Sequence, residues 1–70
     1  MVSENDLRVF EFIKAYIAKH GTPPSTRDIA TALNIPSTNT VQRRKLALQE
    51  AGYISFVPRV ARSIVVLKDD

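Results

Sequence analysis

The chain has 70 residues, of which 44% are hydrophobic, with no cysteine and a single histidine, His20. We treat residues 1–70 as one small domain, because this length supports only a thin core. The lack of cysteine excludes disulfides, thiol catalysis and cysteine-ligated metals, and one histidine cannot build a metal site. No apolar run approaches the roughly 18 residues of a membrane span, and Met1 opens no signal segment. We therefore expect a cytoplasmic protein that is not an enzyme and uses no metal or other cofactor.

Positive charge is concentrated in the middle of the chain, although the net charge is only +3. Residues 1–24 hold three basic and three acidic residues, whereas residues 25–62 hold six basic residues against two acidic ones. The six are Arg27, Arg43, Arg44, Lys45, Arg59 and Arg62. This distribution suits a surface for a polyanion, although an ordinary solvated face gives the same count.

The first predicted element is a helix over Asn5–His20. Its apolar residues recur at helical spacing and are Leu7, Phe10, Ile13 and Ile17. Ser3 is a candidate N-cap, with Asp6 three residues later as the second half of a capping box. Gly21 supplies a left-handed C-cap, and Pro23–Pro24 prevent the helix from continuing.

A short second helix is predicted over Thr26–Leu33. Ser25 or Thr26 can cap it, and Asp28 in its first turn suits the helix dipole. Its apolar stripe consists of Ile29, Ala30 and Leu33.

A tight turn is predicted to join this helix to a third one over residues 38–51. Asn34 tolerates the left-handed conformation that ends a helix, and Ile35 can fill the angle between the two helices. Ser37 is the candidate N-cap of the third helix. Two helices joined in this way form a helix-turn-helix unit.

Beyond Gly52 the pattern becomes typical of strands. Tyr53–Val57 and Ser63–Leu67 are rich in aromatic and β-branched residues, and Pro58–Arg62 lies between them. We predict a two-stranded antiparallel hairpin over residues 54–67, called the wing below, which must pack on the helices because a lone ribbon is marginally stable. The predicted fold class is mainly α (α+β), with three helices and this hairpin.

The start of the third helix carries short polar side chains and arginines that suit the edges of DNA bases. Hydroxyl and amide groups can donate and accept hydrogen bonds there, and arginine can grip guanine with two hydrogen bonds. In the hairpin, Arg59 or Arg62 would meet phosphate or a narrow minor groove. Each feature alone also fits an N-cap, a solvated helix start or a ribbon that merely covers the core. Together they favour binding to duplex DNA.

At this point the chain resembles the DNA-binding domain of LexA-type repressors of the SOS response. The most specific part of the resemblance is the segment Gly21–Ala30, which reads GTPPSTRDIA. It continues over Phe12–Lys14, Ser37–Val41, Ala51–Ile54, Pro58 and Arg62–Ile64. The resemblance implies a winged helix-turn-helix that represses transcription by placing residues 38–51 in the major groove of a palindromic operator.

The resemblance also implies roles for individual residues. By position, base reading falls on Ser37, Asn39, Thr40, Gln42 and Arg43. Contacts to the DNA backbone are expected from Ser25, Thr26, Arg27, Thr38, Arg44, Arg59 and Arg62.

Lys45 departs from the family pattern, which usually has an apolar residue at this position. Lys45 should share one helix face with Val41 and Leu48, so we expect its amine to reach out of the core along a buried stem. Leu46 is then left pointing away from that face, available to a partner.

The wing is also more apolar than DNA contact requires, because it includes Val57, Val60 and Ala61. A second hypothesis is therefore an adaptor or antirepressor that binds a protein, or a second copy, through the wing and Leu46. A third is the DNA-binding part of a replication initiator or recombinase. LexA-type repressors also carry a self-cleaving C-terminal domain, and the sequence leaves open an excised domain or a free-standing relative.

Overall fold

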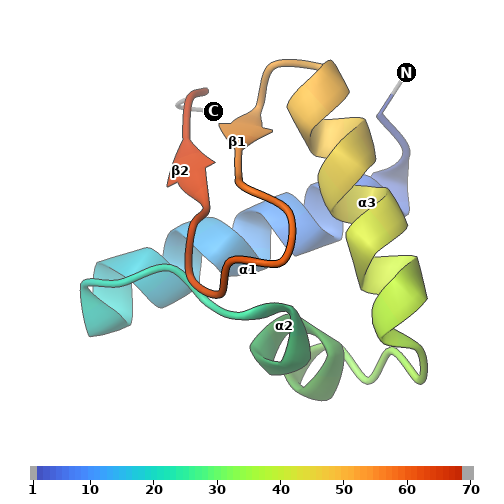
Figure 1. Ribbon diagram of the computed structural model, residues 1–70, viewed down its shortest axis with the longest axis horizontal. Coiled ribbons are helices and arrows are strands. Elements are labelled where there is room, and N and C mark those ends of the chain that lie inside the picture. Colours follow the sequence, from blue (N-terminus) through green and yellow to red (C-terminus); the bar gives the residue numbers. More distant parts are fainter. Residues whose placement is uncertain (1, 69–70) are drawn as a thin grey trace.

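The computed structural model describes residues 2–68, which form three helices followed by a two-stranded antiparallel sheet (Figure 1). The elements are α1 (Glu4–His20), α2 (Thr26–Ala32), α3 (Thr38–Glu50), β1 (Ile54–Ser55) and β2 (Val65–Val66). This arrangement confirms the predicted fold class, a mainly α winged helix-turn-helix. Within the described residues, no helix combines the length and the apolar character that crossing a membrane requires.

The helix ends follow the capping chemistry expected from the sequence. The Ser3 hydroxyl accepts from the Asp6 N–H, and the Asp6 carboxylate accepts from the Ser3 N–H. Ser25 and Asp28 repeat this capping box at the start of α2. Gly21 ends α1 in the left-handed conformation, with φ of 76°. These contacts satisfy amide and carbonyl groups that lack partners inside the helix, so the observed bounds lie within one residue of the predicted ones.

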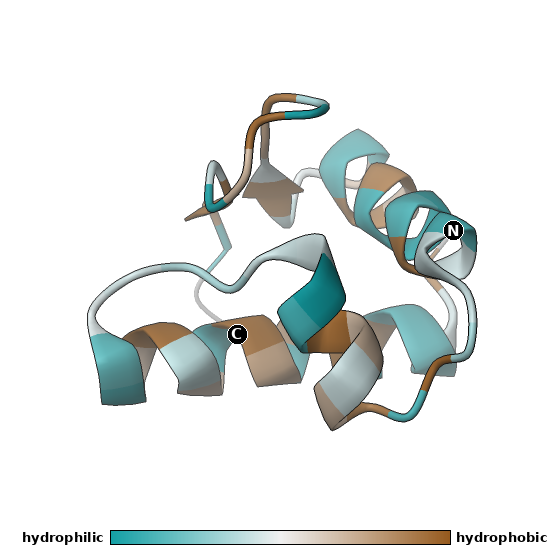
Figure 2. Ribbon diagram, turned by 60° about the horizontal axis from the view of Figure 1, so that its bottom comes forward, coloured by the Kyte–Doolittle hydropathy of each residue, from teal (hydrophilic) through white to brown (hydrophobic). Residues whose placement is uncertain are grey.

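The three helices and the hairpin enclose one core. α3 packs on α1 and α2, and β1 packs on α3, as Figure 1 shows. Apolar segments alternate with hydrophilic ones along α1 and α3 (Figure 2), as in helices with one buried face. The core residues are Val9, Phe10, Ile13, Ile29, Ala30, Val41, Leu48, Ile54, Phe56 and Ile64.

The turn between α2 and α3 has the geometry that its residues predict. Asn34 adopts φ of 57°, and the Ile35 N–H donates to the Ala30 carbonyl at 2.8 Å. The Ser37 hydroxyl then caps α3 by accepting from the Asn39 N–H at 3.2 Å. The turn therefore fixes where the first residues of α3 emerge from the fold.

The strands are shorter than the sequence predicted. Strands over Tyr53–Val57 and Ser63–Leu67 were expected, but β1 and β2 have two residues each. After β1, side chains bind backbone groups of the chain. The Phe56 N–H donates to the Gln49 amide oxygen at 2.8 Å. The Ser63 hydroxyl bonds both the N–H and the carbonyl of Val57. Residues 56–64, the wing loop below, are consequently held by side-chain contacts rather than by a ladder.

The position of Lys45 also differs from the prediction. Its amine was expected to reach out of the core, but it does not. The residue is only 6% exposed. Its Nζ donates to Thr26 Oγ1 at 3.0 Å and lies 4.3 Å from the centre of the Phe56 ring. A hydroxyl oxygen and an aromatic face both stabilise an ammonium group. Lys45 therefore finds its partners inside the fold.

Candidate nucleic-acid interface

Three segments that are distant in the sequence meet around one hollow of about 240 Å³. They are the start of α2, one flank of α3 and the wing loop. The residues that line the hollow are Ser25, Thr26, Arg27, Gln42, Lys45, Arg59, Val60 and Ala61. Five of these had been predicted to contact DNA, and none of the eight carries a carboxylate. The fold therefore gathers positive charge and hydrogen-bonding groups at this hollow.

The outward face of α3 presents two of the predicted base-reading residues. Asn39 and Arg43 are both exposed and lie one helical turn apart. Thr38, in the same first turn, is also exposed, and Leu46 continues the outward face at 45% exposure. The beginning of α3 is thus free to contact another molecule.

The flank of α3 that faces α1 holds Thr40 and Arg44. Both line a second hollow, of about 300 Å³, together with Asp6, Arg43 and Ala47. Arg44 Nη1 binds Asp6 Oδ1 at 3.1 Å, so this predicted DNA contact already joins α3 to α1. The sequence did not reveal this pair, because 38 residues separate its two members.

Asp6 is almost completely buried in this pair, with 5% of the residue exposed. Burial by itself raises the pKa of Asp6. The Ser3 N–H, the Arg44 guanidinium and the Ser3 hydroxyl outweigh that effect and hold the pKa below its usual 3.8. Asp6 therefore stays ionised and links the capping box of α1 to α3.

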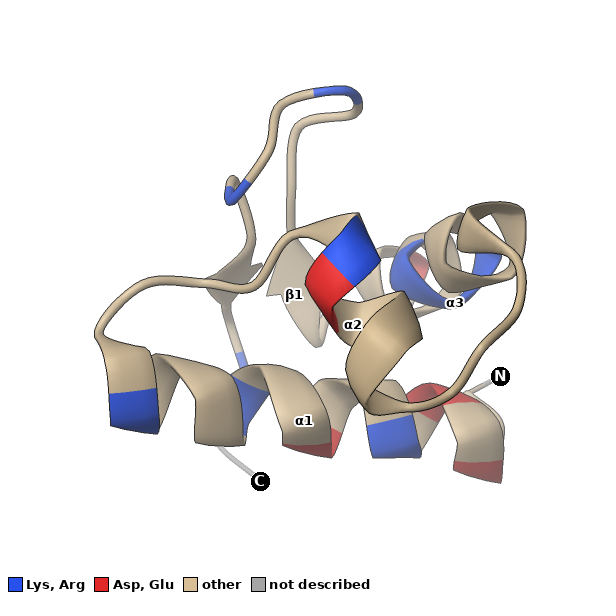
Figure 3. Ribbon diagram, turned by 90° about the horizontal axis from the view of Figure 1, so that it is seen from below, with Lys and Arg blue, Asp and Glu red and all other residues tan. Residues whose placement is uncertain are grey.

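The basic residues are spread over several elements. In Figure 3 basic segments lie on the wing loop, at the start of α2 and on α3, whereas α1 carries charges of both signs. Asp28 lies among the basic segments, but its carboxylate accepts from the Ser25 N–H at 3.0 Å and from the Tyr16 hydroxyl at 3.3 Å. The Ser25 contact contributes most to holding the pKa of Asp28 below its usual value.

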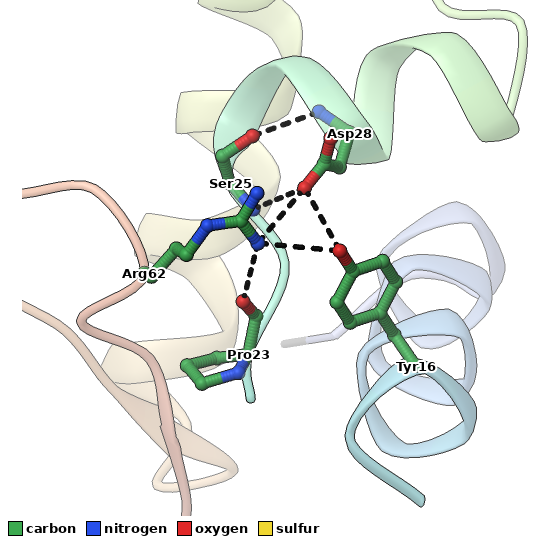
Figure 4. Close-up of polar contacts among 5 residues, drawn as sticks. All are labelled: Tyr16, Pro23, Ser25, Asp28 and Arg62. Atoms are coloured by element: carbon green, nitrogen blue, oxygen red, sulfur yellow. Dashed lines mark hydrogen bonds and ion pairs between the residues drawn. The ribbon is translucent and has the colours of Figure 1, made fainter. Parts of the chain in front are cut away.

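Arg62 fastens the wing to the helices, as Figure 4 shows. Its Nη1 lies 3.2 Å from the Tyr16 hydroxyl, 3.1 Å from the Pro23 carbonyl oxygen and 3.2 Å from Asp28 Oδ2. Arg59 differs, because within residues 2–68 its guanidinium makes no hydrogen bond or ion pair. Both arginines adopt positive φ, 67° at Arg59 and 58° at Arg62. The two wing arginines, which the sequence could not tell apart, thus have different surroundings.

Replacing Arg62 by Ala is expected to loosen the wing without unfolding the domain. The amides of Val57 and Val60, which are hydrogen-bonded within the wing loop, should exchange with solvent about tenfold faster. The melting temperature should hardly change, because Arg62 is half-exposed and such ion pairs contribute little stability. Arg59→Ala is the matched control, since it removes the same charge from the same loop. Equal exchange rates in the two variants would contradict this anchoring role.

Comparison with known proteins identifies the family of this chain. A model of the LexA DNA-binding domain matches residues 2–63. The LexA repressor 2 of Pseudomonas putida is 46% identical over 56 residues, covering 80% of this chain and 28% of that protein. The LexA repressor of Clostridioides difficile is 39% identical over 67 residues, covering 96% of this chain and 32% of that protein. The chain therefore spans about a third of the length of these relatives.

Proposed function

The chain belongs to the family of LexA DNA-binding domains, and on this premise we propose that it binds duplex DNA sequence-specifically and represses transcription. In this proposal α3 enters the major groove, which is wide enough for a helix. The wing loop then lies along the backbone and the minor groove beside it. The gathering of α2, α3 and the wing loop around one cationic hollow is the observation that supports this proposal most strongly.

Within the major groove, Asn39 and Arg43 are the principal base readers in our proposal. An amide can pair with adenine and a guanidinium with guanine, each through two hydrogen bonds. Their exposure on the outward face of α3 supports these roles. Ser37, Thr40 and Gln42 contribute further contacts at the edges of the same groove.

Phosphate contacts are proposed for the residues that surround the outward face of α3. They are Ser25, Thr26, Arg27, Thr38, Arg44, Arg59 and Arg62. Arg44 and Arg62 bind their partners within residues 2–68 through Nη1. A guanidinium has five N–H donors, so the donors on Nε and Nη2 remain for phosphate.

The first test compares Arg43→Ala with Arg59→Ala on duplexes selected from a random pool. Arg43→Ala should weaken binding to the selected sequence by about 5- to 150-fold and relax the preference at one base pair. Arg59→Ala should weaken binding to all sequences alike and reduce the salt dependence by about one phosphate, because a phosphate contact carries no sequence information. Gel-shift titrations at several salt concentrations measure both effects.

Lys19→Ala is the control for this test, since Lys19 is an exposed basic residue in the last turn of α1 and is not among the proposed contact residues. It should leave sequence preference and salt dependence unchanged. If Arg43→Ala and Arg59→Ala behave like Lys19→Ala, the assignment of roles is wrong.

We further propose a palindromic operator bound by two copies of the protein. One module meets only one half-site, and high specific affinity usually needs paired interfaces. A repressor of this kind acts on the chromosome, so the proposal includes a cytoplasmic location. A palindromic consensus among the selected duplexes would support the symmetry, and a consensus without it would contradict it.

A contact with a second copy or another protein is a second candidate function, favoured by the apolar exterior of this region. Leu46, Val57 and Val60 are 45%, 55% and 53% exposed. A DNA binder that neutralises about four or five phosphates has a log–log salt slope of roughly −4, whereas a protein adaptor has almost none. The salt dependence of duplex binding therefore separates the two functions.

A further inference from the structure

The lining of the hollow between α2, α3 and the wing loop includes a buried lysine. Lys45 is 6% exposed, yet it lines this hollow together with Arg27 and Arg59. Three cationic side chains therefore surround a space of about 240 Å³, and no carboxylate from residues 2–68 lines it. Like charges gathered without a counter-ion destabilise a fold unless an anion offsets them.

The hydrogen bond between Lys45 and Thr26 fixes which group donates and which accepts. An ammonium group has three N–H donors and no acceptor, so in the contact between Lys45 Nζ and Thr26 Oγ1 the hydroxyl must accept. The hydrogen of that hydroxyl then remains for another acceptor. The ammonium also lies over the Phe56 ring, at 4.3 Å from the ring centre. Thr26 and Lys45 both line the hollow. Their mutual contact uses one of the three ammonium hydrogens and leaves the hydroxyl hydrogen unused.

We propose that Lys45 and Thr26 together form a binding site for one phosphate of the DNA backbone, with Arg27 and Arg59 at its rim. A phosphate oxygen within the hollow accepts from the Thr26 hydroxyl and from the Lys45 ammonium. Arg27 and Arg59, both exposed, approach its other oxygens from the side of solvent. The inference rests on the proposed function, and it gives the unexpected buried lysine a role in that function.

Two properties of Lys45 support this site. Burial lowers the pKa of the Lys45 amine, because the charged form loses hydration. A bound phosphate would return to the ammonium some of the favourable interaction that burial removes. In addition, the Phe56 ring and Thr26 hold the amine in place before DNA arrives, so little side-chain entropy remains to be lost on binding.

The test uses Lys45→Met, which keeps an apolar stem and removes the ammonium, with Lys14→Met as matched control. The Lys14 amine also lies over a phenylalanine ring, that of Phe10 at 4.7 Å, but it belongs to α1. On a short duplex of mixed sequence, Lys45→Met should weaken binding about tenfold and reduce the salt slope by about one. Lys14→Met should change affinity by less than about twofold and leave the slope unchanged.

A double-mutant cycle then tests whether lysine and hydroxyl act as one site. Thr26→Val should also weaken binding, whereas Thr26→Ser, which retains the hydroxyl, should bind like the unmodified protein. Lys45→Met should cost much less in the Thr26→Val background than alone, because the same phosphate contact is already lost. If the losses of affinity in the two single variants add up in the double variant, the proposal is overturned, because the two residues then act independently.

The remaining outcomes separate this proposal from the proposed function. If the unmodified protein shows no salt-dependent duplex binding, the proposed function itself fails. If it binds DNA but Lys45→Met behaves like Lys14→Met, only the phosphate site is overturned. Should circular dichroism show that Lys45→Met is unfolded, the comparison of Thr26→Val with Thr26→Ser decides the question, and equal affinities then overturn the proposal.

Discussion

Two copies of the chain joined by a flexible linker are expected to bind a duplex with two half-sites about 10²- to 10⁴-fold more tightly than one copy. The reason is that one module presents a single α3 and a single wing loop, and so contacts one half-site. Once the first module is bound, the second event becomes intramolecular. Half-sites one helical turn apart lie about 34 Å from each other, which a glycine- and serine-rich linker of about 40 residues can span.

Fluorescence anisotropy measures this gain with a duplex taken from the selection experiment. The control is the same linked protein on a duplex in which one half-site is scrambled, where most of the gain should disappear. If the linked protein binds the intact and the scrambled duplex equally, the operator is not read by two modules and the proposed symmetry fails.

Replacing Asp6 by Ala is expected to lower the free energy of unfolding by about 2–3 kcal/mol, since it removes both a capping contact and a charged hydrogen bond. Asp6 is 5% exposed and binds the Ser3 N–H at 3.0 Å and Arg44 Nη1 at 3.1 Å. A domain of this size has about 4–10 kcal/mol of stability in total, so the loss is substantial. Urea unfolding monitored by circular dichroism measures it.

The same residue should make stability depend on pH. The pKa of Asp6 is lower in the folded protein than its value of 3.8 in an unfolded chain. Its contribution is therefore present above pH 3.8 and is lost as the pH falls through 3.8 and then through the folded value. The unmodified protein should accordingly lose stability on acidification more steeply than Asp6→Asn, and the two should converge.

Glu4→Gln is the control for this measurement, because Glu4 is an exposed carboxylate in the same first turn of α1. It should follow the acid unfolding of the unmodified protein. If the free energy of unfolding fell with pH equally steeply in Asp6→Asn and in the unmodified protein, ionisation of Asp6 would not stabilise the fold.

The helices could be predicted from the sequence because their ends depend on neighbouring residues. Ser3, Gly21, Ser25 and Asn34 each act within about four residues, through caps or a left-handed backbone. The strands were predicted less well, because the length of a ladder depends on which groups compete for its backbone. The Gln49 amide and the Ser63 hydroxyl bind backbone groups there that the sequence assigned to the ladder.

Among the candidate site residues, the sequence by itself determined the identity of the positive and hydrogen-bonding groups and the helix that carries half of them. Only the tertiary structure decided which of them are free. Arg44 and Arg62 find carboxylates 38 and 34 residues away, Lys45 finds a hydroxyl 19 residues away, and Arg43 remains exposed. The sequence shows which residues are charged. The partner of each charge depends on which elements pack against each other, and this packing is determined by the burial of the whole core.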